Sequence, residues 1–272
     1  MLVKYPLIGL FFSLIALSFY WMPIFNFFKL KTYNNIQRVH KYEVSRLGGL
    51  VIYFYLWILY LFGFVEGNLF FNILLSALPI IFISLREDLA HNTSPKIRLF
   101  SMIISCLIFF YINPMYFPAI EIPLIGQFIS LYPVSIIFFT FCILVSVNGM
   151  NLIDGCNGLF GLTALIQLLS ITLIAFHYDD IELVRISLLF IMPLLAFLFF
   201  NYPYGKIFAG DLGAYFYGFV IALLNIYLFG RHKDLIDWLA ILILFYPSME
   251  LLFSFTRKIK NQQSPFDADK NH

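Results

Sequence analysis

Long blocks of apolar residues constrain this chain more than any other feature of its sequence. Each approaches the length of about 20 residues that a helix needs to cross the hydrocarbon core of a bilayer. The blocks are apolar all round, without the two-residue alternation of a β-barrel strand. They predict an all-α polytopic bundle of about nine transmembrane spans. The expected spans lie near residues 6–25, 48–65, 69–85, 97–112, 131–148, 157–176, 184–200, 212–229 and 235–253.

The composition supports a membrane protein and argues against a soluble domain. Of the 272 residues, 61% are hydrophobic and 12% are charged, whereas about 25% of the residues in a soluble domain are charged. A formal net charge of +2 gives no reason to expect nucleic acid as a partner. The first block follows Lys4 and lacks a small-x-small cleavage site, so we expect an uncleaved span within a bilayer.

The loops between the blocks divide into two sets of unequal charge. One set, with Arg98 at the edge of a block, holds 13 of the 17 Lys and Arg residues. The positive-inside rule therefore places this set in the cytoplasm, with the Arg231 to Lys233 segment as the one local exception. Residues 1–272 then form a single integral membrane domain whose active face consists of these loops. The loops span residues 26–47, 86–96, 149–156, 201–211 and 254–272.

The longest connection on the opposite side, residues 113–130, contains several prolines and a glycine. These residues favour an irregular or hairpin-like loop rather than a helix.

The first polar cluster of the active face contains Glu87 and Asp88, followed by Lys96 and Arg98. Adjacent residues on a helix point in different directions, so one acid can face a site while the other orients a neighbour or a metal. The two basic side chains suit phosphate oxygens. A solvated loop that caps two helices is the alternative interpretation.

The second cluster, residues 148–159, lies directly between two apolar blocks. It holds three Asn, one Asp and three Gly within eleven residues. A tight turn between helices is one explanation. Polar groups at membrane depth are costly unless they are used, however, and the oxygens of Asn151 and Asp154 suit Mg²⁺. We therefore favour a functional role.

The remaining clusters are shorter. Asp211, bracketed by glycines, stands at the start of an apolar block, either as a helix cap or as a carboxylate that holds a hydrated cation and its phosphate ligand. Arg46 precedes Gly48 and Gly49 in a basic segment that suits anionic lipid headgroups. The segment that ends at His272 reads in isolation as a polar tail.

Together and in this order, the clusters resemble the polyprenyl-phosphate N-acetylhexosamine-1-phosphate transferase family. The most specific matches are Asn151-x-x-Asp154-Gly-x-x-Gly158-Leu159 and Phe208-Ala-Gly-Asp211-x-Gly213. Weaker support comes from Arg46-x-Gly48-Gly49, Glu87-Asp88 and Ser264-Pro-Phe-x-x-Asp269-Lys-Asn-His272. The similarity is greatest to the bacterial branch that initiates O-antigen, enterobacterial common antigen and related glycans, including lipopolysaccharide.

The resemblance implies a Mg²⁺-dependent enzyme, with Mn²⁺ as an alternative ion, in the bacterial inner membrane. Its substrates would be a UDP-N-acetylhexosamine and undecaprenyl phosphate, and UMP would be released. Asn151 and Asp211 would hold the metal, while Glu87, Asp88 and Asp154 would serve as catalytic acids. The expected contacts to phosphate or nucleotide are Lys96, Arg98, Arg46 and His272.

Two departures from the family pattern affect these expectations. The family commonly has two aspartates where this chain has Glu87-Asp88, which leaves open which acid acts on the lipid phosphate. The sequence also stops at His272, where family members continue, so we expect a truncated chain. The identity of the HexNAc and the oligomeric state, a homodimer included, stay open. The main alternative function is a secondary transporter or flippase for an anionic lipid or sugar.

Overall fold

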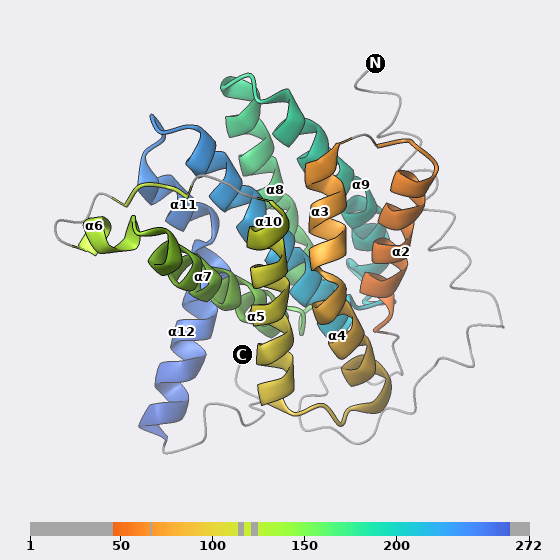
Figure 1. The fold of residues 1–272 in the computed structure, drawn as a ribbon. Coiled ribbons are helices and arrows are strands. Elements are labelled where there is room, and N and C mark those ends of the chain that lie inside the picture. The colour runs from red at the N-terminus through yellow and green to blue at the C-terminus, as the bar shows by residue number, and fades with distance from the viewer. Residues whose placement is uncertain (1–45, 66, 114–116, 121–124, 262–272) are drawn as a thin grey trace.

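The computed structural model describes residues 46–65, 67–113, 117–120 and 125–261 of this chain (Figure 1). The predicted first span, 6–25, and the predicted phosphate contact His272 lie outside these residues. The regular elements of the described part are α-helices, which confirms the all-α prediction. They are α2 (Gly48–Leu61), α3 (Asn68–Ser76), α4 (Leu78–Ala90), α5 (Pro95–Ile112), α6 (Ile125–Ile129), α7 (Tyr132–Ile153), α8 (Leu159–His177), α9 (Ile181–Asn201), α10 (Gly210–Arg231), α11 (Asp237–Ile243) and α12 (Phe245–Lys260).

The described residues do not confirm the nine expected spans. Five of their helices, α5, α7, α8, α9 and α10, are each long and apolar enough to cross a membrane. Two bent pairs, α3 with α4 at 42° and α11 with α12 at 68°, raise the number to seven if each pair is one span, while α2 is shorter. Pro79 and Pro247 lie near the two bends, and proline removes a hydrogen-bond donor and crowds the preceding turn. Hydropathy does not detect such breaks, because the residues on both sides are apolar.

Helix α10 occupies the centre of the bundle and packs against α2, α4, α7 and α8 (Figure 1). In its most apolar stretch 94% of the residues are buried, against 33–61% in the other four long helices. Small residues allow this close packing. A Cβ atom added to Gly218 would lie 2.7 Å from the Cα atom of Val147 on α7.

The break between α11 and α12 is stabilised by two amide side chains. Gln167 of α8 donates a hydrogen bond to the carbonyl of Ile243 (2.9 Å), and Asn225 of α10 donates one to the carbonyl of Ala240 (2.9 Å). The last carbonyls of a helix have no partner within it, and an unsatisfied carbonyl is costly in a bilayer. The amide of Gln167 therefore provides a partner for the carbonyl of Ile243, and that of Asn225 adds a second donor to the carbonyl of Ala240, which also accepts the N–H of Leu244 (3.4 Å).

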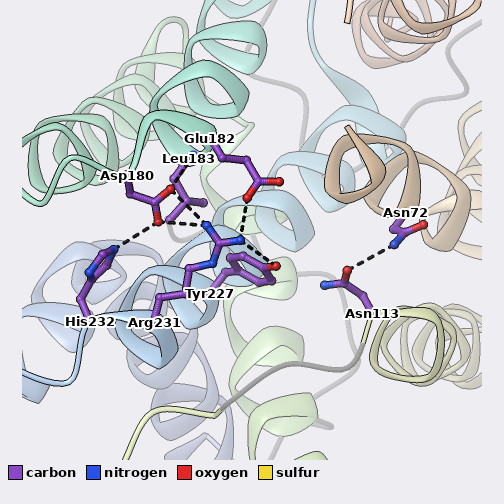
Figure 2. Close-up of polar contacts among 8 residues, drawn as sticks. All are labelled: Asn72, Asn113, Asp180, Glu182, Leu183, Tyr227, Arg231 and His232. Atoms are coloured by element: carbon purple, nitrogen blue, oxygen red, sulfur yellow. Dashed lines mark hydrogen bonds and ion pairs between the residues drawn. The ribbon is translucent and has the colours of Figure 1, made fainter. Parts of the chain in front are cut away.

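The two ends of α10 carry different polar clusters. Its 22 residues correspond to about 33 Å of helix. At the C-terminal end, Arg231 forms ion pairs with Asp180 (3.1 Å) and Glu182 (2.6 Å), and His232 contacts Asp180 (3.2 Å; Figure 2). The same view shows Asn72 of α3 donating a hydrogen bond to Asn113 (3.2 Å). Arg231, which departs from the charge pattern of the loops, is thus balanced by acids on its own side.

Candidate active site at the N-terminus of α10

The other polar cluster surrounds the first turn of α10. Gly210, the first residue of the helix, has a φ of +73°, a conformation that glycine adopts without strain. A Cβ atom at this position would lie 2.2 Å from the carbonyl oxygen of Arg46 and 2.8 Å from the carboxylate of Asp88. The backbone at the start of α10 therefore lies close to the backbone of Arg46 and to the carboxylate of Asp88.

Two carboxylates from other segments bind the backbone at the start of α10. Asp88, near the end of α4 and only 1% exposed, accepts hydrogen bonds from the N–H groups of Asp211 (2.9 Å) and Leu212 (3.0 Å). Asp154, which directly follows α7, accepts one from Gly210 (3.0 Å). The first N–H groups of a helix lack intrahelical partners and carry partial positive charge. Asp88 and Asp154 thus fix the helix start, while Asp211 lies within the first turn.

The surroundings of Asp154 favour its neutral form more than water would. Burial raises the pKa of Asp154 well above its usual value, and the negative charge of Asp88 acts in the same direction. The hydrogen bond from Gly210 and the positive charge of Arg46 act in the opposite direction without cancelling the effect of burial. Arg46 thus lies close enough to influence both acids, as its effect on Asp88 also shows.

Asp211 is held between a cation and an amide. Arg98 of α5 forms an ion pair with its Oδ2 atom (3.0 Å), and the side-chain amide of Asn151, in the last turn of α7, donates a hydrogen bond to its Oδ1 atom (3.0 Å). Arg98 also donates a hydrogen bond to the hydroxyl of Tyr215, one turn further along α10 (3.4 Å). Side chains from three helices, far apart in the sequence, therefore meet at one carboxylate.

The adjacent acids Glu87 and Asp88 occupy different surroundings, as expected for neighbours on a helix. Asp88 is buried against α10, whereas Glu87 is half-buried and accepts a hydrogen bond from the N–H of Thr93 (2.8 Å). The charge of Glu87 acts on Arg98 and on Tyr215. Glu87 therefore belongs to the electrostatic surroundings of Asp211, while Asp88 binds the backbone.

Asn201, a residue that the sequence analysis did not select, connects the two loops of the site. It is 2% exposed, accepts a hydrogen bond from the N–H of Gly158 (2.6 Å) and donates one to the carbonyl of Ile207 (2.7 Å). The first loop follows Asp154, and the second leads to Asp211. A lone asparagine at the end of an apolar block was the available signal, but its two partners depend on tertiary structure.

The remaining predicted phosphate contact of the described chain, Lys96, is exposed in the first turn of α5 and lies outside this group of contacts. The predicted loops are also shorter than expected, because the helices extend into them. Asn151 lies on α7, and α12 continues to Lys260 through a segment that we predicted as loop from residue 254.

The donor set at Asp211 suits a divalent metal that is completed by substrate oxygens. Among the described residues, no group of three or more His, Cys, Asp and Glu side chains could hold a metal without help. Mg²⁺ commonly binds one or two carboxylates together with substrate phosphates and water. The carboxylate of Asp211 and the carbonyl oxygen of the Asn151 side chain are donors of this kind.

The chain matches known proteins over most of its length. Residues 70–229 match the model of glycosyl transferase family 4, a range that contains Glu87, Asp88, Asn151, Asp154 and Asp211. A protein of Bacillus subtilis named "Probable undecaprenyl-phosphate N-acetylglucosaminyl 1-phosphate transferase" is 28% identical over 252 residues, which cover 87% of this chain and 66% of that protein.

Several other relatives carry the name phospho-N-acetylmuramoyl-pentapeptide-transferase. One from Streptococcus agalactiae is 25% identical over 181 residues, which cover 65% of this chain and 53% of the relative. One from Dictyoglomus thermophilum is 46% identical over 91 residues, which cover 33% of this chain and 29% of the relative. The chain thus spans less than two thirds of the length of these relatives.

Proposed function

This chain belongs to glycosyl transferase family 4, and on that premise we propose that it transfers a HexNAc 1-phosphate from a UDP-N-acetylhexosamine to undecaprenyl phosphate. The observation that carries the proposal is the convergence of Arg98 and Asn151 on Asp211, beside Glu87, at one end of a bundle of apolar helices. A nucleotide sugar from the aqueous phase and a lipid phosphate from the bilayer can meet at such a place. The names of the relatives support the same class of reaction.

The reaction joins two anions and needs no redox partner. An oxygen of the lipid phosphate forms a bond to the phosphorus that carries the sugar. The bond from that phosphorus to the oxygen bridging the two phosphates of the donor breaks, and its electron pair leaves with UMP. The protein must reduce the repulsion between the anions and hold the attacking oxygen in line. The basic side chains of Arg98 and Arg46, at the cluster, suit the task of reducing this repulsion.

Asp211 and Asn151 are the residues that would hold Mg²⁺ or Mn²⁺. Such an ion supplies positive charge to the phosphate oxygens of the donor. Lys96, exposed beside the cluster, and His272 are further proposed contacts of the phosphates or the nucleotide.

The geometry suggests different roles for the three other acids. Both oxygens of Asp88 accept backbone N–H groups, so we assign it the task of positioning the first turn of α10. Asp154 positions the same turn through Gly210. Glu87 binds one backbone N–H through a single oxygen and faces Arg98. It is therefore our candidate for orienting the lipid phosphate or receiving its proton.

We place the site on the cytoplasmic side of a bacterial membrane, where UDP-sugars are available. The excess of Lys and Arg in the loops at this end supports that orientation. The product, a lipid-linked diphosphate sugar, would start an envelope polysaccharide such as the O-antigen of lipopolysaccharide. GlcNAc, GalNAc and deoxy-amino sugars such as FucNAc and QuiNAc are candidate sugars.

The alternative, a transporter or flippase, needs polar groups that face a substrate near the middle of the bundle. The charged residues of the central helix α10 are Asp211 and Arg231, at its two ends. The interior amides of Gln167 and Asn225 donate to the carbonyls of Ile243 and Ala240. These positions favour the transferase.

The test supplies membranes that contain the chain with Mg²⁺, undecaprenyl phosphate and a panel of UDP-HexNAc donors, and measures UMP. We expect release with at least one donor, and a loss on the order of 100-fold or more in Asp211→Asn. Asp234→Asn, an exposed acid at the far end of α10, is the matched control and should keep full activity. No UMP from any donor, together with lipid-linked sugar persisting in a knockout, would reject the proposal.

A further inference from the structure

The carboxylate of Asp211 is bound by the protein's own donors at both oxygens. Arg98 lies 3.0 Å from Oδ2, and the amide nitrogen of Asn151 lies 3.0 Å from Oδ1. This is the side chain to which the proposed function assigns the metal. A divalent cation and the Arg98 guanidinium would thus be two positive groups at one carboxylate, where they repel each other.

The contacts of Arg98 are those of a side chain that can change partners. It reaches Asp211 and the hydroxyl of Tyr215 through the same nitrogen, Nη1, rather than through the two-nitrogen fork that guanidinium groups form with carboxylates and phosphates. Its Nε atom is buried and has no hydrogen-bond partner among the residues described. The side chain thus retains N–H donors for an anion with several oxygens, such as a phosphate.

Arg98 has two acceptors on α10, the carboxylate of Asp211 and the hydroxyl of Tyr215, which lies beside that carboxylate. Arg98 is also 24% exposed, so its head group lies at the boundary of the cluster rather than in the bundle core. A side chain at this boundary is reachable by a ligand from the aqueous phase.

We propose that Arg98 and a divalent cation compete for the Asp211 carboxylate, so that binding of the cation releases the guanidinium toward the diphosphate of the donor. This inference rests on the proposed function for the identity of the metal site and of the donor. It adds an order of events, because the metal frees the side chain that then binds the phosphates. It also implies that Arg98 weakens binding of the cation and strengthens binding of the donor.

The test measures the affinity of the full-length chain for Mn²⁺ in detergent by electron paramagnetic resonance, without donor or lipid phosphate. Arg98→Gln removes the positive charge of the guanidinium. It should tighten Mn²⁺ binding about tenfold, because both the repulsion between Arg98 and the metal and the competing ion pair with Asp211 are lost. Arg98→Lys keeps the charge and should stay close to the wild-type affinity. Asp211→Asn should remove most of the binding.

A second measurement follows binding of a UDP-HexNAc donor by equilibrium dialysis at saturating Mn²⁺. Arg98→Gln should weaken donor binding about tenfold, in the direction opposite to its effect on the metal. Arg98→Met, which keeps the apolar stem, replaces this variant if Arg98→Gln does not fold. Equal or weaker Mn²⁺ binding in the uncharged variant overturns the competition and leaves the transferase proposal intact. Failure of the wild type to bind Mn²⁺ overturns both the competition and the metal site.

Discussion

The carboxylate of Asp88 accepts the backbone N–H of Asp211, the residue whose own carboxylate is bound by Arg98 and Asn151. One acid thus positions the backbone of another. Its second oxygen binds the next N–H, that of Leu212. The acids of this cluster therefore divide into those that build the start of α10 and those that remain for chemistry, a division that explains why adjacent Glu87 and Asp88 differ in burial.

The first prediction separates these roles by stability. Asp88→Asn keeps one acceptor oxygen but places an NH₂ group against a backbone N–H, so it should lower the free energy of unfolding by about 1–3 kcal/mol. Asp211→Asn leaves both backbone hydrogen bonds of Asp88 intact and loses only the partly exposed ion pair with Arg98, so it should be destabilised less. Thermal unfolding in detergent, read from intrinsic fluorescence, compares the two variants.

The same pair should differ in the transfer assay in a way that stability does not explain. Asp211→Asn is expected to lose UMP release with a smaller loss of melting temperature than Asp88→Asn. A melting temperature unchanged from the wild type in Asp88→Asn would contradict the assignment of Asp88 as the helix cap.

The second prediction concerns Asn201, which connects the loops on either side of the site. Asn201→Leu leaves the N–H of Gly158 and the carbonyl of Ile207 without their partner, and each buried orphan group costs about 1–3 kcal/mol. We expect a lower melting temperature and slower UMP release at temperatures where the variant is fully folded. Asn201→Asp retains the acceptor for Gly158 and should lie between Asn201→Leu and the wild type.

Asn68→Leu, at an exposed helix start outside the cluster, serves as the control and should match the wild type. Unchanged turnover in folded Asn201→Leu would show that the two loops keep their positions without this side chain.

Sequence reasoning selected most of the polar residues of this cluster but not which of them contact each other. Polarity at the ends of apolar blocks selects Glu87, Asp88, Asn151, Asp154 and Asp211, because such groups are costly beside a bilayer unless they are used. Their division of labour depends on which helix packs beside which. The sequence offered Asp211 as a possible cap of its own helix, whereas the caps come from α4 and from the segment after α7.

Prediction of the helices from the sequence is limited in the same way, because it does not reveal how they pack. Hydropathy correctly predicts an all-helical membrane bundle, since it measures how each segment partitions between water and lipid. It does not reveal the bends near Pro79 and Pro247, because an apolar bent pair and an apolar straight span have the same composition. Nor does it identify α10 as the central helix, since its mean hydropathy of 1.8 lies within the range of 1.7–2.4 of the five long helices. Only packing distinguishes the helix that is surrounded from those that face lipid.

The third prediction uses the ion-pair cluster at the other end of α10. Burial raises the pKa of Asp180, but hydrogen bonds from the N–H of Leu183, from Arg231 and from His232 outweigh it, so the pKa lies below the ordinary value of 3.8. An acid whose pKa is lowered on folding contributes stability that is present above its unfolded pKa. That stability is lost as the pH falls through the folded pKa.

The melting temperature of the wild type should therefore fall more steeply than that of Asp180→Asn as the pH drops below about 4. Asp179→Asn, which removes a neighbouring charge outside this ion-pair cluster, should keep the wild-type slope. Both variants should release UMP at the wild-type rate at neutral pH, because about 33 Å of helix separates this end from Asp211. Identical acid slopes for Asp180→Asn and the wild type would exclude a contribution from this cluster.

The fourth prediction tests the close contact between α2 and the start of α10. Gly48 and Gly49 donate backbone hydrogen bonds to the carbonyls of Phe208 (3.1 Å) and Ala209 (3.0 Å), so these glycines dock α2 on the segment that leads to Asp211. A Cβ atom on Gly49 would lie 2.2 Å from the Cα atom of Gly213. Gly49→Ala must push two backbones apart, and overpacking of this kind costs about 1–3 kcal/mol or more.

We expect Gly49→Ala to lower both the melting temperature and the rate of UMP release, since the displaced backbone carries Asp211. Gly155→Ala is the matched control, because a Cβ atom there meets no heavy atom within 4 Å, and its melting temperature should stay at the wild-type value. Equal melting temperatures for the two alanine variants would mean that α2 does not pack this closely on α10. A binding role of the basic segment that contains Arg46 would then be the better explanation for the glycine pair.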